Sequence, residues 1–477
     1  MMTPRAPTRR CLWLVTVACM ALALGVTAAC VGDFTGVDPP GVDRPARAVM
    51  PGAPPSDMDA AAAELPTVDV AGRVVDDLDG PVVGRSVVLV DRRGARKELM
   101  TDEEGGFWAG AVAPPYDVLV QEAPSGPVIT PLAFLGLRRT DPRLEVSERG
   151  GPAPRPPSQP VRVGVRLPPC RGDDAACWVS VVSASASGGG SVMGSYVGGT
   201  EHAVFELDHA WREPTTRPDE SLVVHVLVGD AEYTQYAYER VSRIAAMPGE
   251  PTDLGVVVPA RVESTEPVSI AARADAPLEG WQWTLASELE LAGGAVMPLR
   301  FEWSPCSTMR VPVLPGAAWR VGAWAEHPPT PERAYFHRAS QAWSGTLPLS
   351  TANVALAVPP PPEPLRPELE GTLSRRGRGL AWQGPSPALA SIVLVDRARG
   401  RQRFRAFTAE TELQLSRLEA LGLARLEPGE HVLDMTTTPG AIVDELTDPD
   451  ELGRNRRRDG GSAGATTYQR FRFIVTP

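Results

Sequence analysis

From Val68 onward the chain consists of short runs of β-branched or alternating apolar residues, separated by Gly, Pro and Asp at intervals of roughly ten residues. Val68–Val75 is one such run, Asp79-Gly80 marks a turn, and Ser86–Val90 forms the next run. Runs of this length and spacing favour antiparallel strands packed as two sheets. Only 410–425 has a helical pattern, and its leucine spacing fits a strand and a turn equally well. The sequence therefore predicts an all-β fold of tandem β-sandwich domains.

Length and charge narrow the class of protein further. The 477 residues, 43% of them hydrophobic, provide enough apolar surface for several domains. The formal net charge is -11. A nucleic-acid partner is therefore not expected, because such binding needs a basic face that releases counterions from phosphates.

The N-terminus has the plan of a secretory signal peptide. Arg5, Arg9 and Arg10 precede an apolar run that ends in the small residues Thr27-Ala28-Ala29, directly before Cys30. We expect residues 1–29 to be removed and residues 30–66, which are rich in Pro, Ala, Asp and Gly, to form a disordered tether. An uncleaved signal anchor, or an ordinary signal peptide followed by a chance Cys, are the alternatives.

The segment Thr27–Cys30 resembles the lipobox of bacterial lipoproteins. The resemblance implies that the Cys30 sulfur carries diacylglycerol and that its amino group receives a further acyl chain such as palmitate. Two or three acyl chains hold a protein firmly on a membrane, whereas one chain does not. Val31 stands where Asp would retain a lipoprotein in the inner membrane, so the resemblance implies a lipid anchor in the cell envelope, at the outer membrane.

Residues 67–126 carry a second resemblance. The segments that carry it are Gly72–Asp76, Gly80–Val87, Thr101-Asp102, Gly105–Phe107 and Tyr116–Val120. Together they resemble the carboxypeptidase regulatory-like domain, a prealbumin-like sandwich that carries no catalytic residue. We expect Gly80 and Gly84 to supply positive φ at turns, and Phe107 and Tyr116 to point inward.

The remaining chain divides into further predicted blocks. We expect a linker at 127–160, sandwiches at 161–259 and 260–358, a stiff polyproline spacer at 359–362, and a last domain at 363–477 with a flexible insertion at 448–465. The last domain resembles a fibronectin type III domain. Trp382 stands where that fold buries a tryptophan, and His431 stands where the family usually places the tyrosine of the corner hydrogen bond.

Cysteine usage fits an oxidising compartment. Cys170 and Cys177 enclose a short polar loop that a disulfide could close, so we predict that they pair. Cys306 is then left without an assigned partner.

No catalytic or metal site is predicted, and no cofactor. The motifs of zinc peptidases are absent from the sequence. Gly460–Gly464 matches the Gly-x-Ser-x-Gly elbow, but no strand and helix pattern surrounds it. Asp76–Gly80 resembles part of a calcium loop, with Ser86 in the place of the bidentate Glu. Another group of metal-binding residue types has no recognised spacing: His202, Asp208, His209, His225 and Asp230.

The block at 260–358 is rich in tryptophan. Trp281 and Trp283 share one strand face, and with Trp324 they are candidates for stacking on sugars; burial in the sandwich core is the stronger alternative. The sequence thus predicts a non-catalytic envelope lipoprotein that acts as a structural or adhesive scaffold. Its partner would be an envelope protein or polysaccharide, and the alternative function is glycan binding by the Trp-rich domain.

Overall fold

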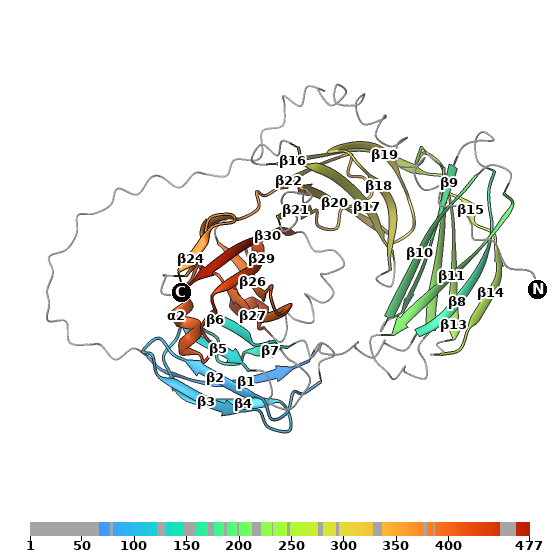
Figure 1. Cartoon of the computed structure of the whole chain (residues 1–477). Helices are drawn as coiled ribbons and strands as arrows, with labels where there is room; N and C mark the ends of the chain where they lie inside the picture. The colour runs from blue at the N-terminus through green and yellow to red at the C-terminus, as the bar shows by residue number, and fades with distance from the viewer. Residues whose placement is uncertain are drawn as a thin grey trace, which may run out of the picture. The chain divides into compact units, whose positions relative to one another are not determined.

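The computed structural model describes residues 66–76, 80–121, 130–146, 158–169, 176–185, 188–197, 200–211, 221–230, 232–245, 249–274, 280–291, 295–327, 336–374, 379–384, 387–448 and 464–477. These residues form almost only strands, arranged as tandem β-sandwich domains (Figure 1). The expected all-β fold is confirmed. The predicted signal peptide, Cys30, the tether, Cys170 and the Gly460–Ala463 part of the Gly-x-Ser-x-Gly match lie outside the described residues.

The first domain is a sandwich of two sheets. Its strands are β1 (Val68–Val75), β2 (Ser86–Val90), β3 (Arg96–Met100), β4 (Gly106–Val112), β5 (Tyr116–Val120), β6 (Leu132–Leu137) and β7 (Arg143–Glu145). One sheet has the order β4-β1-β7, and β3, β2, β5 and β6 form the other layer. Phe107 and Tyr116 point into the core between the layers, as expected. Gly84 has the expected positive φ of 66°. At Gly80 the turn is held by a hydrogen bond from its backbone nitrogen to the Asp76 carboxylate.

The predicted linker at 127–160 needs correction, because three strands begin within it. β6 and β7 complete the first sandwich, and β8 starts at Ser158. The six residues of β6 are almost all buried, because Leu132 and Phe134 lie in the core of the first domain while Ala133 and Leu135, on the opposite face, lie in the core of the last domain. A strand buried on both faces shows no alternation of polar and apolar residues. The sequence of β6 therefore lacks the alternation that predicts a strand, and the Pro and Gly residues around it indicate a linker instead.

The second domain contains one eight-stranded sheet in the order β14-β8-β11-β10-β9-β12-β13-β15. Its strands are β8 (Ser158–Arg166), β9 (Ala176–Ser185), β10 (Gly188–Val197), β11 (His202–Trp211), β12 (Ser221–Gly229), β13 (Tyr236–Ala245), β14 (Thr252–Val257) and β15 (Ala260–Arg261). Side chains from β8, β9, β11 and β12 share one core. Strand β9 serves two cores: Val179 and Val181 face this one, while Trp178 and Val182 belong to the core of the third domain.

The third domain repeats the strand order of the first. Its strands are β16 (Thr265–Ala274), β17 (Gln282–Glu290), β18 (Val296–Glu302), β19 (Cys306–Pro312), β20 (Ala318–His327), β21 (His337–Trp343) and β22 (Asn353–Val358). Strand β16 pairs with β19 and, in parallel, with β22, as β1 pairs with β4 and β7. The second layer, β18-β17-β20-β21, corresponds to β3-β2-β5-β6.

The last domain has a different order. Its elements are β23 (Glu363–Arg366), β24 (Thr372–Ser374), β25 (Leu380–Gln383), β26 (Ala388–Asp396), β27 (Arg401–Thr408), β28 (Glu412–Leu413), α2 (Leu415–Ala420), β29 (Gly429–Pro439), α3 (Val443–Leu446) and β30 (Gly464–Thr476). One layer is β23-β25-β28 and the other is β27-β26-β29-β30. Trp382 is buried in the core between them, as expected.

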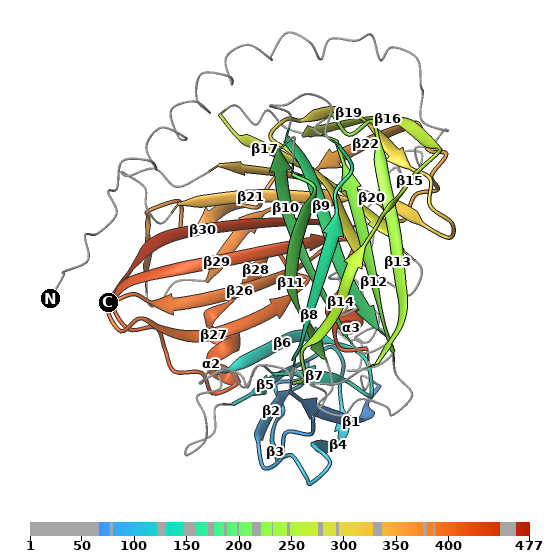
Figure 2. The same cartoon turned by 90° about the vertical axis from the view of Figure 1, so that its right-hand side faces the viewer.

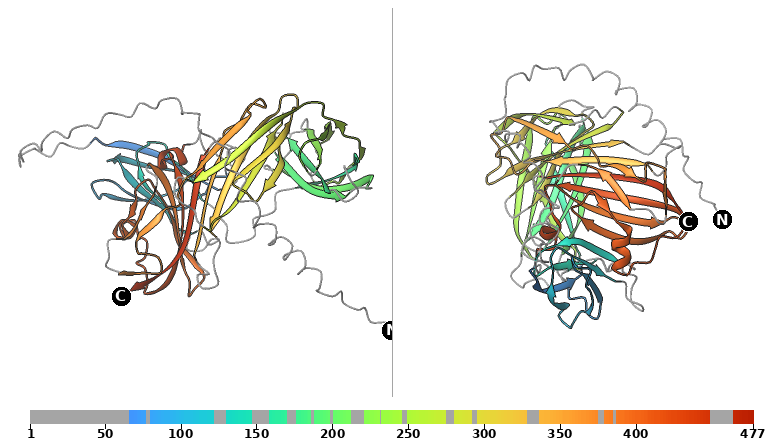
Figure 3. Two further views of the ribbon diagram at one scale, coloured as in Figure 1. Left: turned by 90° about the horizontal axis from the view of Figure 1, so that it is seen from above. Right: turned by 90° about the vertical axis from the view of Figure 1, so that its left-hand side faces the viewer.

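Three of these domains share one continuous sheet. Strand β30 pairs with β21 of the third domain, and β27 pairs in parallel with β6 of the first domain. The result is a thirteen-stranded sheet in which the four-stranded layer of the last domain lies between the other two (Figures 2 and 3). Both edges of that layer are thereby covered, and unpaired edges are what makes sheets prone to unwanted association.

The predicted spacer at 359–362 is packed against the protein. Pro361 and Pro362 are buried, and the Ser340 hydroxyl donates to the carbonyl of Pro359. Because β21 already pairs with β30, the third and last domains lie in direct contact, and this short segment cannot hold them apart. The expectation of a free, stiff spacer is therefore wrong.

Candidate functional site

The three tryptophans proposed to stack on sugars lie on opposite faces of one layer. Trp281 and Trp283 are half-buried and pack against the core of the third domain. Trp324 lies on the outer face, because it is paired in register with Thr284 and Gln341 and its Nε1 donates to Gln341 Oε1 at 2.6 Å. The structure therefore does not bring these three residues together in one row.

Trp343 is the neighbour that the sequence analysis did not single out. It pairs with Gly322 across β20 and β21, and its indole meets that of Trp324 edge to face, with centroids 4.9 Å apart. A Cβ added to Gly322 would lie 2.8 Å from Trp343 Cε2 and 2.9 Å from Cδ2, the two atoms of the fused bond. The face of the Trp343 indole therefore covers Gly322, and a larger side chain there would displace it.

An ion-paired arginine supports the same indole. Arg320, also on β20, has its Cζ 4.9 Å from the centroid of the Trp343 ring. Its guanidinium is held 2.5 Å from Glu288 Oε2 and 3.5 Å from Glu290 Oε1. The Arg320 side chain is only 4% exposed, and burying its charge costs free energy. The two carboxylates offset that cost. The cation–π contact then fixes the position of the ring.

Two further aromatic side chains of the third domain, on β18 and just after it, are exposed. Phe301, on the edge strand β18, is 52% exposed and pairs in register with Ala286 on the same outer face. Trp303, just beyond the end of β18, is 81% exposed. Their spacing of two residues was visible in the sequence, but only the register shows that Phe301 faces outward alongside Trp343. We call Phe301, Trp324 and Trp343 the outer aromatic face.

A groove of about 450 Å³ borders this face at the open edge of the third sandwich. It is lined by Trp343, by residues of β22 including Val354 and Leu356, and by the start of β30 at Gly464 and Ala465. Its walls are mainly apolar side chains and strand backbone.

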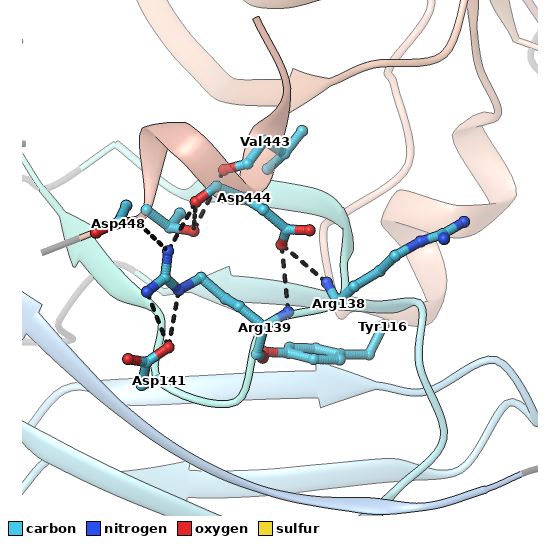
Figure 4. A network of polar contacts seen from close by, with 8 residues as sticks. Tyr116, Arg138, Arg139, Asp141, Val443, Asp444 and Asp448 are labelled. Carbon is cyan, nitrogen blue, oxygen red and sulfur yellow. Dashed lines mark hydrogen bonds and ion pairs between the residues drawn. The ribbon is translucent and has the colours of Figure 1, made fainter. Parts of the chain in front are cut away.

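The first and last domains meet through a polar network around α3 (Figure 4). Asp444 Oδ1 accepts hydrogen bonds from the backbone nitrogens of Arg138, at 2.9 Å, and Arg139, at 3.3 Å. The Arg139 guanidinium donates to the Asp444 carbonyl and forms ion pairs with Asp141 and Asp448. The Tyr116 hydroxyl donates to the Arg139 carbonyl, and burial raises the pKa of this tyrosine above its ordinary value. Thus α3 is tied to the loop that follows β6.

A second ion pair joins the same domains near α2. Arg417 donates from Nε to Asp117 Oδ2 at 2.5 Å and from Nη2 to Asp117 Oδ1 at 2.7 Å. Burial lowers the pKa of Arg417, but the hydrogen bonds and charges of Asp117 and Glu410 outweigh it, so the pKa is raised above its ordinary value. A two-pronged Arg–carboxylate pair of this kind fixes both distance and orientation.

The histidines and acids of the second domain do not gather. The buried His209 is bonded through Nδ1 to Ser183 and through Nε2 to Ser185, whereas His202 is exposed. The Nδ1 of His225 lies 2.7 Å from the Tyr238 hydroxyl, and Asp230 accepts from Thr234. Within the described ranges, no three His, Cys, Asp or Glu side chains are placed to hold a metal ion.

The cysteines that the structure describes are both oxidised. Cys177, buried in the core of the second domain, and Cys306, at the start of β19, are each disulfide-bonded. Cys306 is therefore not a free thiol, although the sequence left it without a partner. The predicted pairing of Cys177 with Cys170 stays a prediction, since Cys170 is outside the described ranges.

No helix among the described residues is long and apolar enough to cross a membrane. No protein-family model matches the chain, and no curated protein matches it. Among solved structures it is similar to the TIE protein of Bacillus anthracis, at 10% identity and a TM-score of 0.15 over 61% of this chain and 50% of that one. Thus the match spans half the length of that protein.

Two pilins show the same degree of similarity. The major pilin subunit BcpA of Bacillus cereus is 10% identical, with a TM-score of 0.15, over 61% of this chain and 99% of its own. The major pilin SpaD of Corynebacterium diphtheriae is 7% identical, with a TM-score of 0.15, over 61% of this chain and 96% of its own. At these TM-scores we draw nothing about function from the similarities.

Proposed function

We propose that this chain is a non-catalytic envelope lipoprotein that acts as a structural or adhesive scaffold. The observation that carries the scaffold role is the sheet shared by the first, third and last domains. Strand pairing between domains removes the hinges that separate domains normally have, since interdomain contacts are usually small and polar. A unit joined in this way can transmit force and present its strand faces in fixed positions.

The anchoring part of the proposal rests on the sequence. The signal peptide at 1–29 and the lipobox-like Thr27–Cys30 support a lipid anchor in the envelope, at the outer membrane. Growth with radiolabelled palmitate should label the wild-type protein and leave Cys30→Ala unlabelled. The matched control is Cys19→Ala, inside the signal peptide, which should label normally. Equal labelling of all three proteins would contradict the anchor.

The scaffold role has its own experiment. Intact cells should be treated with an amine- and carboxyl-reactive crosslinker, and the protein should then be purified and its attached partners identified. We expect defined envelope partners that persist with the wild-type protein and decrease with Cys30→Ala. Recovery of only free protein in both cases would contradict a scaffold.

Glycan binding by the third domain is the second candidate function. The observation that favours it is the exposure of Phe301 and Trp303 on the domain whose outer face also carries the pair Trp324 and Trp343. Exposed aromatic rings on a sheet face are suited to stacking against sugars.

A further inference from the structure

We propose that the outer aromatic face, Phe301, Trp324 and Trp343, is a binding site for a neutral carbohydrate chain. This deepens the second candidate function and replaces Trp281 and Trp283, which pack against the core. The site lies on the third domain, within the continuous sheet, so a bound polysaccharide would be held by a rigid surface.

The ring geometry supports stacking. The Trp343 indole lies over Gly322 with one face toward the sheet, so its opposite face is turned away from the backbone. The apolar face of a pyranose ring, formed by its C–H groups, packs against a ring face of this kind. Phe301, two strands beyond Gly322 in the same register row, provides an exposed ring, whereas Trp343 is half-buried. Two strand spacings, roughly 10 Å, separate Phe301 from Gly322, which the Trp343 ring covers, so a chain of sugars can contact both rings and a single sugar cannot.

The ring is held in place before any ligand binds. Trp324 contacts Trp343 edge to face, and the nearly buried Arg320 adds a cation–π contact to the same ring. The Trp324 indole is itself held by its hydrogen bond to Gln341. Binding to side chains that are already ordered loses little conformational entropy.

The charges around the site favour a neutral ligand. The single Arg320 is paired with both Glu288 and Glu290, so the two carboxylates outnumber the cation. Carboxylate oxygens accept hydrogen bonds from sugar hydroxyls, and they repel the carboxylates or phosphates of an acidic polymer. The groove next to Trp343 offers space for the chain to continue.

Isothermal titration of the full-length protein in detergent tests the proposal. The probes are cellohexaose, chitohexaose and mannohexaose as neutral chains, and hexagalacturonic acid as the acidic chain. We expect at least one neutral hexamer to bind and the acidic chain not to bind. Phe301→Ala and Trp343→Ala should each weaken binding by about tenfold, the effect of losing one stacked ring.

Two further variants separate stacking from folding. Trp108→Ala removes a tryptophan that is 63% exposed on the first domain and should leave affinity unchanged. Gly322→Ala keeps every ring but displaces the indoles of Trp343 and Trp324, and should also weaken binding. Circular dichroism checks that each variant is folded; Phe301 is exposed enough that its loss should not disturb the fold.

Each of the following results would overturn a stated part of the proposal. Failure of all neutral hexamers to bind the wild-type protein would overturn the carbohydrate site and leave the scaffold role intact. Binding that survives both Phe301→Ala and Trp343→Ala would place the glycan elsewhere and overturn this site. Preferential binding of the acidic hexamer would overturn the charge argument.

Discussion

The Nε2 atom of His431 lies 3.0 Å from the carbonyl oxygen of Glu427, four residues upstream. The resemblance of this segment to a fibronectin type III domain predicts a backbone contact of this kind, made there by a tyrosine. His431 is 2% exposed and its ring stacks on Phe473 on the neighbouring strand. A protonated Nε2 is the donor, because a carbonyl can only accept. The His431 side chain thus ties the start of β29 to the segment before it.

His431→Phe should keep the stacking and lose the hydrogen bond. We expect the free energy of unfolding to fall by about 1–2 kcal/mol, because the Glu427 carbonyl is left without its partner. Hydrogen exchange followed by mass spectrometry should show faster exchange in β29, while β8 of the second domain stays unchanged. His431→Tyr is the matched variant and should exchange more slowly than His431→Phe. Equal exchange in the wild type and both variants would mean that the corner contributes nothing.

Asp117 and Arg417 should be energetically coupled across the junction of the first and last domains. Asp117→Asn leaves a half-buried guanidinium with Glu410 as its remaining charged partner, and Arg417→Met removes the cation. A double-mutant cycle on the urea midpoint should give a coupling energy of about 1–3 kcal/mol, the range for hydrogen bonds to charged groups. The exposed pair Arg162–Glu206 is the control and should give almost none. A junction coupling no larger than the control would show that the pair does not hold the domains.

His225 should make the second domain less stable in mild acid. Burial, with a smaller effect of Arg240, lowers its pKa from the ordinary value of 6.5 to about 4. Between these values the unfolded chain binds a proton that the folded domain does not, so stability falls as the pH drops from 6.5 to 4. The full loss is about 3 kcal/mol. Above pH 6.5 both states are neutral and the effect is absent.

Thermal unfolding at pH 7.5, 5.5 and 4.5 measures this effect. His225→Gln should flatten the pH dependence of the melting temperature, whatever its effect at pH 7.5. The exposed His202→Gln should leave the wild-type pH dependence unchanged. If the melting temperature depends on pH equally in His225→Gln and the wild type, the acid sensitivity comes from other groups.

Local pattern predicted much of this fold, and the parts it missed depend on contacts between distant segments. The alternating runs of β1 and β8 and the inward-facing Phe107, Tyr116 and Trp382 follow from residues close in the chain. Pairing of β6 with β27 joins segments more than 250 residues apart, and no period in the sequence encodes such a partner.

The candidate site, like the fold, could be predicted from local sequence only in part. The abundance of tryptophan in the third domain was visible in the sequence, but the face on which each ring lies depends on strand register. Trp281 and Trp283 do share a face, as their spacing indicates, and it is the core face. Trp343 became relevant only because β21 places it opposite a glycine. A glycine on a neighbouring strand leaves no trace in the local pattern around Trp343.

Peptide mapping under non-reducing conditions should show that Cys177 and Cys306 are both oxidised in the mature protein. The sequence predicts a Cys170–Cys177 bond, which would close a local loop of the second domain. A Cys177–Cys306 bond would instead tie the second domain to the third, next to the place where Trp178 enters the core of the third domain. Closing that much longer loop would restrict the unfolded chain more, by about 2–3 kcal/mol.

Cys170→Ser distinguishes the two pairings. If Cys177 pairs with Cys170, this variant releases a thiol at Cys177 that iodoacetamide labels after unfolding. If Cys177 pairs with Cys306, the variant leaves both oxidised and its melting temperature close to that of the wild type. Cys306→Ser is the reciprocal variant and should free Cys177 only in the second case. Full labelling of Cys177 and Cys306 in the unreduced wild-type protein would contradict their oxidation altogether.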